Sequence, residues 1–339
     1  MKKYLLIPQS DGPSKLDLQE AEKPSPAPSE VLIKMHACSL NYRDLLMLSG
    51  QSGSGGSEPV VPLSDGAGEI VEIGADVSEW QIGDRVMPTF FRDWQDGRFD
   101  MSYHKAARGG SCDGVLAEFV SARAHSLVRI PEHLSFSEAA TLPCAGLTAW
   151  HSLMERPHPL RAGDSVLCLG TGGVSIFALQ ISKAVEARVL ITSSSDEKLA
   201  RAIELGADDT INYTRQADWE KVVYKKTDRR GVDHVIEVGG AGTLDKSLAS
   251  VAAGGTISQI GVLTGFDPVP TSLFPLVTKN AHLNGIYVGS REMFRNFNRF
   301  LKKHQLKPVI DQAFNFDDAP KAYETLRNAG HFGKIAINF

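Results

Sequence analysis

The sequence predicts an α/β protein in which a doubly wound parallel sheet is joined to a smaller β-rich domain. Three observations support this prediction. A glycine-dense turn near residue 170 links a short apolar run to a helix-like segment. Strand-like and helix-like segments then alternate as far as residue 288, which is typical of a parallel sheet with helical crossovers. The first 125 residues instead hold short strand-like runs separated by proline- and glycine-rich clusters.

The glycine-dense turn has the form of a dinucleotide-binding site. Val166 to Leu169 is an apolar run typical of a buried strand, and apolar residues at helical spacing follow the turn. Such a turn lets backbone approach a pyrophosphate, and the helix N-terminus offers N–H groups and partial positive charge. Ser175 replaces the usual third glycine, so a glycine-rich turn of an ordinary α/β domain is the alternative interpretation. The residues expected to bind the cofactor here are Gly170, Gly172, Gly173 and Val174.

The other strands expected for this sheet follow along the chain. Arg188 to Thr192 comes about twenty residues after the turn, where a residue that contacts the cofactor ribose is expected. The later strand-like runs are residues 209–212, 232–238, 256–261 and 282–288. A helix is predicted over 291–304 and a closing strand over 333–339.

Composition argues against several classes of protein. The formal net charge of −4 provides no basic surface for nucleic acid. The four cysteines include no C-x-x-C pair, which favours reduced thiols in a cytosolic protein over a disulfide framework. No segment approaches transmembrane length. We therefore expect a soluble, cytoplasmic protein that acts on a small molecule, without nucleic acid or membrane as a partner.

Motifs spread over the chain carry a resemblance to a known family. They lie at residues 28–34, 39–44, 62–68, 71–77, 83–86 and 142–149, together with the turn at Gly170. With these motifs the chain resembles the medium-chain dehydrogenase/reductase superfamily along nearly its whole length. The resemblance implies a GroES-like catalytic domain (1–125), a Rossmann NAD(P)-binding domain (126–290) and a C-terminal return to the first domain (291–339). It also implies a cofactor in the cleft between the domains.

The chain departs from the zinc-dependent branch of that superfamily. Asn41 and Ser64 stand where the resemblance places the first cysteine and the histidine ligand, and only Cys144 matches a ligand. Catalytic zinc usually has three protein ligands of Cys, His or carboxylate type. We therefore expect no metal site, and we expect Cys144 to be a buried apolar side chain.

The four-cysteine structural zinc lobe is also missing from the sequence. Met87 to Asp113 takes its place and contains several aromatic residues but only one cysteine, Cys112. A segment of this length without clear periodicity is uncommon unless it is functional or disordered, and its aromatic content argues against disorder. Two alternatives remain: a lid over the substrate, or a loop that packs on its own domain or on a partner subunit.

The residues after the second strand predict the cofactor preference. An acidic residue there normally binds the ribose 2′-hydroxyl of NAD, but Ser193 occupies the matching position. Hydroxyl groups do not repel a 2′-phosphate, and Lys198 and Tyr213 could reach it, so NADPH is predicted over NADH. Asp196 is expected in the first turn of the next helix. The resemblance adds Thr148, at the nicotinamide half, and the pair Gly261 and Val262.

The expected chemistry is a metal-free hydride transfer. In zinc-free relatives the turn holding Asn41 and Tyr42 faces the nicotinamide, and both side chains can donate hydrogen bonds. We therefore expect an NADPH-dependent reductase of an activated C=C bond or a quinone. The alternatives are an alcohol dehydrogenase or carbonyl reductase that works without metal, and a non-catalytic, crystallin-like NADPH-binding protein. The strand at 282–288 would leave an apolar sheet edge, which predicts a homodimer.

Overall fold

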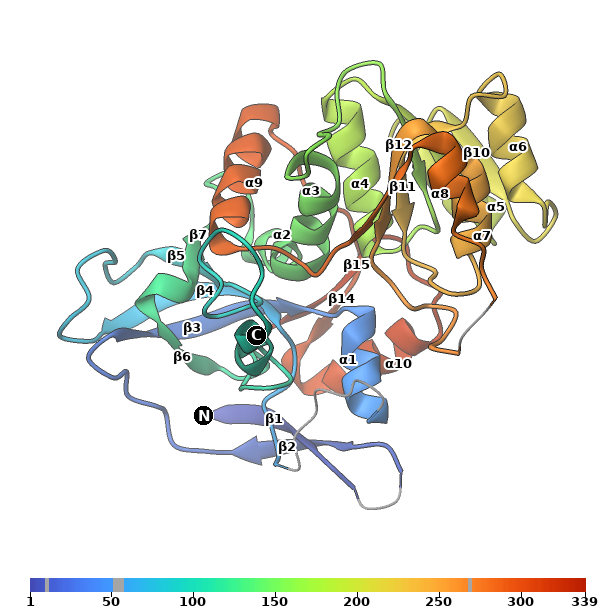
Figure 1. The fold of residues 1–339 in the computed structure, drawn as a ribbon. Coiled ribbons are helices and arrows are strands. Elements are labelled where there is room, and N and C mark those ends of the chain that lie inside the picture. The colour runs from blue at the N-terminus through green and yellow to red at the C-terminus, as the bar shows by residue number, and fades with distance from the viewer. Residues whose placement is uncertain (10–11, 51–57, 268–269) are drawn as a thin grey trace. The chain divides into compact units, whose positions relative to one another are not determined.

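The computed structural model describes all residues except 10–11, 51–57 and 268–269. The described residues form two compact units (Figure 1). Unit 1 consists of Met1–Leu147 and Val288–Phe339, and unit 2 consists of Thr148–Tyr287. The domain boundaries expected from the sequence lie at residues 125 and 290, whereas residues 126–147 belong to unit 1 in the structure. Unit 1 is therefore assembled from two segments that unit 2 separates in the sequence.

Unit 1 contains a mixed seven-stranded sheet. Its strands are β3 (Glu30–Ser39), β4 (Asp65–Ile73), β5 (Arg85–Pro88), β6 (Phe119–Arg123), β7 (Leu127–Arg129), β14 (Ile310–Asn315) and β15 (Lys334–Asn338). The order is β14-β15-β3-β4-β5-β7, and β6 also pairs with β3. A separate antiparallel pair is formed by β1 (Lys2–Ile7) and β2 (Lys15–Glu20). This is the β-rich, GroES-like domain that the sequence predicts.

The strand β15 completes this sheet from the C-terminal segment. It pairs antiparallel with β3, with Ile337 opposite Cys38 and Ala336 opposite Ser39. Beyond the ladder, the amide of Leu40 donates to the carbonyl of Ile335 at 3.1 Å. The start of β15 is thereby brought against the residues that immediately follow β3.

Four helices accompany this sheet. They are α1 (Tyr42–Ser49), α2 (Phe136–Ala139), α9 (Arg291–His304) and α10 (Ala319–Arg327). Tyr323 and Leu326 of α10 are buried in the same core as Ile335 and Ile337 of β15. The helix predicted over residues 291–304 is confirmed with the same bounds as α9.

The glycines of the 62–68 motif have a packing reason. A Cβ atom on Gly68 would lie 2.3 Å from the carbonyl oxygen of Lys34, and one on Gly66 would lie 2.5 Å from Cε of Met35. Only glycine lets β4 lie this close to β3, its neighbour in the sheet. Asp65, which precedes Gly66, is held in register opposite Ser39 at the end of β3.

Unit 2 is a doubly wound parallel sheet of six strands. These are β8 (Ser165–Cys168), β9 (Arg188–Ser193), β10 (Asp209–Asn212), β11 (Val232–Glu237), β12 (Val251–Gln259) and β13 (His282–Gly285). Their order is β10-β9-β8-β11-β12-β13, and every pairing is parallel. The predicted Rossmann sheet is confirmed, although β12 begins earlier and β13 ends earlier than the sequence pattern predicts.

Helices connect the strands of unit 2. They are α4 (Gly173–Ala184), α5 (Asp196–Glu204), α6 (Trp219–Lys226), α7 (Leu244–Ser250) and α8 (Phe274–Lys279), and α3 (Leu147–Met154) precedes the first strand. In the part of the chain that the structure describes, no helix has the length and apolar character needed to cross a bilayer. Because all six strands are parallel, the turns that follow them gather at one edge of the sheet, where ligands of such folds bind.

Candidate active site

The turn between β8 and α4 forms an open cradle of backbone. Gly170 has a left-handed φ of 73°. The amide of Gly170 donates a hydrogen bond to Oγ1 of Thr192, in the neighbouring strand β9, at 3.1 Å. A Cβ atom built on Gly170 or Gly172 would meet nothing within 4 Å. No side chain caps the N-terminus of α4, so its first N–H groups remain available to an anion.

Ser175 stands where the usual motif has its third glycine, and α4 still packs closely on β8. Its side chain is buried, and its hydroxyl donates to the carbonyl of Leu169 at 2.6 Å. This hydrogen bond ties the first turn of α4 to the end of β8. The serine therefore keeps the close contact between helix and strand that glycine allows in the usual motif.

The predicted 2′-phosphate residues meet at the ends of β9 and β10. Ser193 is buried, and its hydroxyl accepts from the amide of Ser195 at 3.3 Å. The amide of Tyr213 donates to the carbonyl of Ser193 at 3.1 Å, while the Tyr213 side chain is exposed. Ser195 caps α5 by accepting from the amide of Lys198. Backbone contacts thus bring Ser193, Lys198 and Tyr213 to one corner of the sheet.

Asp196 has partners of its own at this corner. Asn212 donates from Nδ2 to its carboxylate at 2.6 Å, and Arg215 forms an ion pair with it. It also lies in the first turn of α5, where an acidic residue is favourable to the helix dipole. This is the structural role that the sequence predicts for Asp196.

A buried carboxylate organises the turn after β11. Glu237 is fully buried and accepts hydrogen bonds from the amides of Gly239 and Gly240 at 2.7 and 2.9 Å. The hydroxyls of Thr243 and Ser247 also donate to it. Four donors converge on one carboxylate, which is how a buried charge is satisfied. The sequence analysis missed Glu237, although a single acid at the end of an apolar strand was a usable signal.

The remaining predicted cofactor residues lie elsewhere in unit 2. Thr148 is buried in the first turn of α3. Gly261 follows β12, and a Cβ atom there would lie 2.0 Å from the carbonyl oxygen of Val238. Gly261 and Val262 therefore belong to a backbone segment that packs on the turn organised by Glu237. This close approach accounts for the glycine.

In unit 1 the turn that begins α1 is held by its own carboxylate. The amide of Asn41 donates to Oδ2 of Asp44 at 2.7 Å, and the amide of Asp44 donates back to the carbonyl of Asn41 at 2.9 Å. Asn41 and Asp44 are buried, whereas Tyr42 between them is 39% exposed. Of these three residues, only Tyr42 has a side chain that is exposed to solvent.

Asp44 carries a strongly shifted pKa. Burial raises its pKa to about 6, although Arg43 and the amide of Asn41 favour the charged form. Its Oδ1 lies 3.9 Å from Nη1 of Arg43 and makes no hydrogen bond to another described residue. The carboxylate that holds this turn is therefore costly to ionise.

Four residues lie around Asn41, and with it they form what we call the Lys334 cluster: Asn41, Ser64, Asp65, Cys144 and Lys334. Cys144 is only half-buried, not buried as the sequence predicts, and the other four are buried. Nζ of Lys334 donates to Oδ1 of Asn41 at 2.6 Å and to the carbonyl of Leu40. It lies 4.0 Å from Oδ2 of Asp65. Asp65 also accepts from the Ser64 hydroxyl at 2.7 Å and from the Cys144 amide at 3.1 Å.

The charges of the cluster oppose the effects of burial. Burial lowers the pKa of Lys334, and the carboxylate of Asp65 acts against this. Burial raises the pKa of Asp65, and Lys334 and the Asn41 side chain act against it. Burial also raises the pKa of the Cys144 thiol, and Asp65 raises it further. Nζ of Lys334 donates to two oxygens and lies beside a carboxyl group, which is the environment of an ammonium, and burial keeps the Cys144 thiol protonated.

Comparison with known proteins agrees with this geometry. Residues 27–132 match the alcohol dehydrogenase GroES-like domain, and residues 173–303 match the zinc-binding dehydrogenase family. A zinc-type alcohol dehydrogenase-like protein of Schizosaccharomyces pombe is 43% identical over 99% of this chain and 98% of its own length. The chain belongs to the medium-chain dehydrogenase/reductase superfamily.

Two further relatives show the range of this family. A Sinorhizobium meliloti protein classed with the alcohol dehydrogenases is 42% identical, with a TM-score of 0.90 over the full length of both chains. An acryloyl-coenzyme A reductase of Metallosphaera sedula is 29% identical over 95% of this chain and 96% of its own. Members of this superfamily use a nicotinamide cofactor, and the protein is a nicotinamide-dependent oxidoreductase.

The cradle of unit 2 fits such a cofactor. Space lies open above Gly170 and Gly172, where any side chain would intrude on a pyrophosphate. The uncapped N-terminus of α4 supplies N–H donors at the same place. The residues that would hold the dinucleotide are therefore the turn at 170–174 and the corner around Ser193. A bound nicotinamide would supply or accept a hydride.

The Lys334 cluster does not fit the zinc that the family name implies. Oδ1 of Asn41 already accepts from an ammonium, and the Ser64 hydroxyl donates to Asp65. Only Cys144 and Asp65 in the cluster are of the Cys, His or carboxylate type, whereas catalytic zinc usually has three such protein ligands. Among the residues that the structure describes, no group of three or more His, Cys, Asp or Glu side chains is placed to hold a metal. We derive no catalytic step through a metal.

The segment Met87–Asp113 packs on its own unit. Phe90, Phe91 and Trp94 are almost fully buried, and Phe91, Trp94 and Phe99 make edge-to-face ring contacts. Such contacts between rings add to the stability that burial provides. This burial is what the alternative of a loop packed on its own domain predicts.

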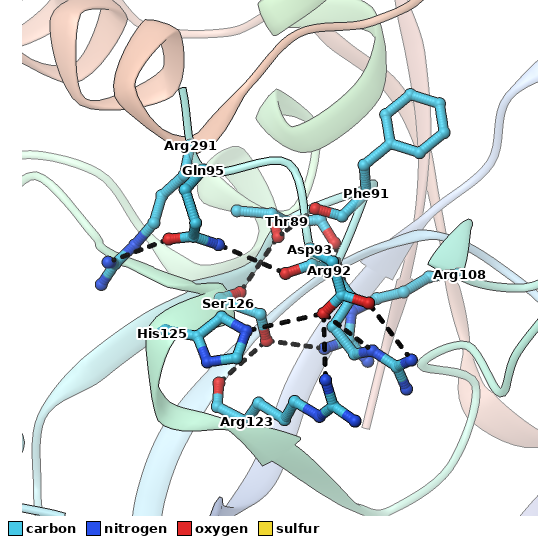
Figure 2. A network of polar contacts seen from close by, with 10 residues as sticks. All are labelled: Thr89, Phe91, Arg92, Asp93, Gln95, Arg108, Arg123, His125, Ser126 and Arg291. Atoms are coloured by element: carbon cyan, nitrogen blue, oxygen red, sulfur yellow. Dashed lines mark hydrogen bonds and ion pairs between the residues drawn. The ribbon is translucent and has the colours of Figure 1, made fainter. Parts of the chain in front are cut away.

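A polar network joins the same segment to the strands beneath it (Figure 2). Arg108 donates to the carbonyl of Thr89 at 3.1 Å and to the Ser126 hydroxyl at 3.0 Å. Asp93 lies 3.2 Å from Nη1 of Arg123 and 3.5 Å from Nε2 of His125. The segment is therefore anchored at its base by buried and half-buried charges.

The pKa of Asp44 leads to a prediction about stability. Below about pH 4 both folded and unfolded chains hold this proton, but between about pH 4 and 6 only the folded chain does. Stability from Asp44 is therefore lost as pH rises through this window. Asp44→Asn has no such proton, so the unfolding free energy of wild type minus variant should fall by about 3 kcal/mol between pH 4 and 7.

Urea unfolding of both proteins across this pH range tests the prediction. Asp233→Asn is the matched control, because Arg230 and Ser165 outweigh burial and lower the pKa of Asp233 to about 2. Asp233 is ionised throughout the range, so its wild-type-minus-variant difference should stay constant. A constant difference for Asp44→Asn as well would contradict the raised pKa.

Proposed function

We propose that the protein reduces an activated carbon–carbon double bond, in an enone or enoyl compound, or a quinone, with NADPH as the hydride source. The observation that carries this proposal is the turn at residues 41–44. Where zinc-dependent relatives have metal ligands, this chain has an ammonium-bound amide beside an exposed tyrosine. The site therefore offers hydrogen-bond donors and no Lewis acid of its own.

The choice of reaction follows from the charge that each reaction develops. Oxidising an alcohol requires its proton to leave as the hydride leaves, and zinc assists by stabilising the oxygen, an effect worth several kcal/mol. Conjugated substrates make a smaller demand, because negative charge moves onto a carbonyl oxygen. One or two well-placed donors can stabilise that oxygen in the manner of an oxyanion hole. The name of the Metallosphaera sedula relative, an acryloyl-coenzyme A reductase, describes a reaction of this class.

We assign the donors to Tyr42 and Asn41. Tyr42 is exposed at the start of α1, so its hydroxyl can reach a substrate oxygen. Nδ2 of Asn41 is buried and makes no hydrogen bond to another described residue. Nδ2 carries two hydrogens, and the Asn41 side chain acts on Asp65, so at least one hydrogen is left for a substrate oxygen. Tyr42, or water, would then deliver the proton that completes the reduction.

The preference for NADPH rests on the corner around Ser193. The position of the acid that favours NAD is a buried serine, and the nearby Asp196 is engaged by Asn212 and Arg215. A 2′-phosphate would meet hydroxyls there instead of an unpaired carboxylate. Lys198 and Tyr213 are held at the same corner by backbone contacts, and we assign them to the phosphate as well.

A second candidate function is alcohol oxidation or carbonyl reduction without metal. The names of the Schizosaccharomyces pombe and Sinorhizobium meliloti relatives favour it. Alcohol oxidation requires a base near the substrate oxygen, and the Lys334 cluster offers only an ammonium, a buried carboxyl group and a thiol, so the first function has stronger support than alcohol oxidation. Carbonyl reduction instead requires a proton donor, which Tyr42 would supply as in the first function, and turnover of simple carbonyl compounds separates the two. Family membership favours an enzyme over the non-catalytic alternative.

We also propose a homodimer through the edge of unit 2. β13 is the edge strand of the six-stranded sheet. Large apolar side chains are exposed around it: Leu263, Phe266, Leu273, Phe274 and Val277. Sheet edges and apolar patches of this kind are usually covered. A second copy across a two-fold axis would cover both.

We propose a reducing, cytoplasmic location on the basis of the cysteines. All four are free, and Cys38 and Cys168 are buried. Burial raises the pKa of both of these thiols. Thiols of this kind behave as small apolar side chains and need no disulfide partner.

Cofactor preference is tested by fluorescence titration. Wild type should bind NADPH more tightly than NADH, and equal affinities for the two would contradict the proposed preference for NADPH. Ser193→Asp should shift the ratio of the two dissociation constants towards NADH by about tenfold or more, because its carboxylate repels the 2′-phosphate. Ser194→Asp, on an exposed side chain one residue later, serves as the matched control and should shift the ratio less.

The role of Tyr42 is tested by Tyr42→Phe. Loss of one donor to the developing oxyanion should lower kcat for an enone or quinone by about 100-fold. NADPH affinity should change less than twofold, because the substitution leaves the cradle of unit 2 intact. An unchanged kcat would exclude Tyr42 from the mechanism.

The two candidate functions differ in their response to metal removal. Enone or quinone reduction should persist after treatment with a strong chelator, and elemental analysis should find no stoichiometric zinc. Chelator-sensitive oxidation of simple alcohols, with bound zinc, would overturn the assignment.

The dimer is tested by light scattering at micromolar concentration. The mass should be twice that of the 36.8 kDa chain. Val277→Asp places a charge in the exposed apolar patch and should yield monomers. A monomeric wild type would refute the proposed interface.

A further inference from the structure

Lys334 is a buried cation whose charge is not needed by the strand that carries it. Its side chain is 3% exposed. β15 is paired through its backbone on both sides, with β14 and with β3, so a methionine of similar length would leave the ladder intact. Removing an ammonium from water costs on the order of several kcal/mol. Lysine is almost never fully buried unless it is paired, so its partners must explain it.

The partners of the ammonium are all at the turn before α1. Two of its donors go to the carbonyl of Leu40 and to Oδ1 of Asn41, the latter at 2.6 Å. Nζ of Lys334 also lies 4.0 Å from Oδ2 of Asp65. Asp65 is itself fixed by the Ser64 hydroxyl and the Cys144 amide. The ammonium therefore lies among three oxygen-bearing groups, Leu40, Asn41 and Asp65.

An ammonium has a specific effect on an amide. The side chain of Asn41 could present either its oxygen or its nitrogen outward, and the two orientations have the same shape. An ammonium has only donors, so it binds the oxygen and excludes the flipped orientation. A charged donor on the oxygen also strengthens the N–H groups at the other end of the amide.

The nitrogen of Asn41 is the end that this arrangement leaves for another acceptor. Nδ2 makes no hydrogen bond of normal geometry within the described structure, although the amide favours the charged form of Asp65. Nδ2 carries two hydrogens, so one can face Asp65 while the second remains for a substrate oxygen. Asn41 directly precedes Tyr42, the exposed donor of the same turn.

We propose that Lys334 is a positioning residue whose ammonium fixes the Asn41 amide with its oxygen inward, so that the amide acts on substrate as a donor. The same ammonium occupies the oxygen that a metal would need. This inference rests on the proposed function, because the oxygen that Asn41 would stabilise belongs to the proposed substrate.

A double-mutant cycle tests whether Lys334 acts through Asn41. Lys334→Met should lower kcat for an enone or quinone by about 10- to 100-fold, and Asn41→Ala by about 100-fold. The combined variant should be no slower than Asn41→Ala alone, because the second change removes nothing further. NADPH affinity should stay within twofold of wild type in all three. Losses that multiply would overturn the proposal.

A charge-balanced variant separates positioning from folding. Lys334→Met alone leaves the Asp65 carboxyl group without its cation, which destabilises the protein. Lys334→Met combined with Asp65→Asn removes both charges and should recover most of the lost melting temperature. Its kcat should remain as low as that of Lys334→Met. Recovery of kcat together with stability would show that Lys334 only stabilises the fold.

A measurement without turnover distinguishes this inference from the proposed function. If wild type reduces neither enones nor quinones, the proposed function fails, and hydrogen–deuterium exchange still tests the role of Lys334. In the charge-balanced variant, amides of residues 41–44 should exchange faster, while those of β4 should not change. Unaltered exchange at residues 41–44 would overturn the positioning role whatever the substrate is.

Discussion

The pairing of β15 with β3 is the constraint on which the catalytic unit depends. β3 lies between β15 and β4 and also pairs with β6, so three strands fix its position. The chain leaves β3 at Leu40 and enters α1 at Tyr42. The geometry of that exit is set by the neighbours of β3 on both sides: Asp65 begins β4, and Lys334 begins β15. A local turn thus derives its shape from residues far away in the sequence.

In unit 2, hydrogen bonds support the backbone turns at the edge of the parallel sheet. Its binding edge consists of backbone turns, which need rigid support if they are to receive a dinucleotide. Ser175, Ser195 and Glu237 provide it, each by hydrogen bonds to backbone amides or carbonyls close by in the sequence. In unit 2 the supports are local, whereas in unit 1 they join residues nearly 300 positions apart.

This contrast explains how much of the molecule the sequence could predict. Local periodicity predicted β10 and α9 with their observed bounds, and the glycine turn at 170 indicated the parallel sheet. β2 and β14 are not among the predicted strands; β14 alternates polar and apolar residues weakly, whereas β2 alternates regularly and its pattern was a usable signal. Leu116 to Val120 is one of the strand-like runs of the first 125 residues. It begins three residues before β6 (Phe119–Arg123), and its first part instead pairs irregularly with β1.

The candidate site divides in the same way. The proposed cofactor residues Ser193 and Tyr213 could be chosen from the sequence, since each comes directly after a predicted strand; in the structure Ser193 ends β9 and Tyr213 follows β10. Nothing near Lys334 in the sequence distinguishes it from the surface lysines, so its burial beside Asn41 could be recognised only from the structure. Glu237 is an intermediate case. An acidic residue within an apolar run is unusual enough to be noticed in the sequence, but the sequence does not show which groups bind it.

The order of the segments has a consequence for the growing polypeptide. All six strands of unit 2 precede residue 288, so its sheet can form while the ribosome is still adding the segment that follows. Unit 1 cannot be completed at that stage, since β14 and β15 do not yet exist. Until residue 334 has been made, Asp65 lacks the ammonium that opposes its charge. A chain interrupted after unit 2 would hold a nucleotide-binding sheet without the finished turn at residues 41–44, and the part of β3 that pairs with β15 would be an unpaired edge open to other chains.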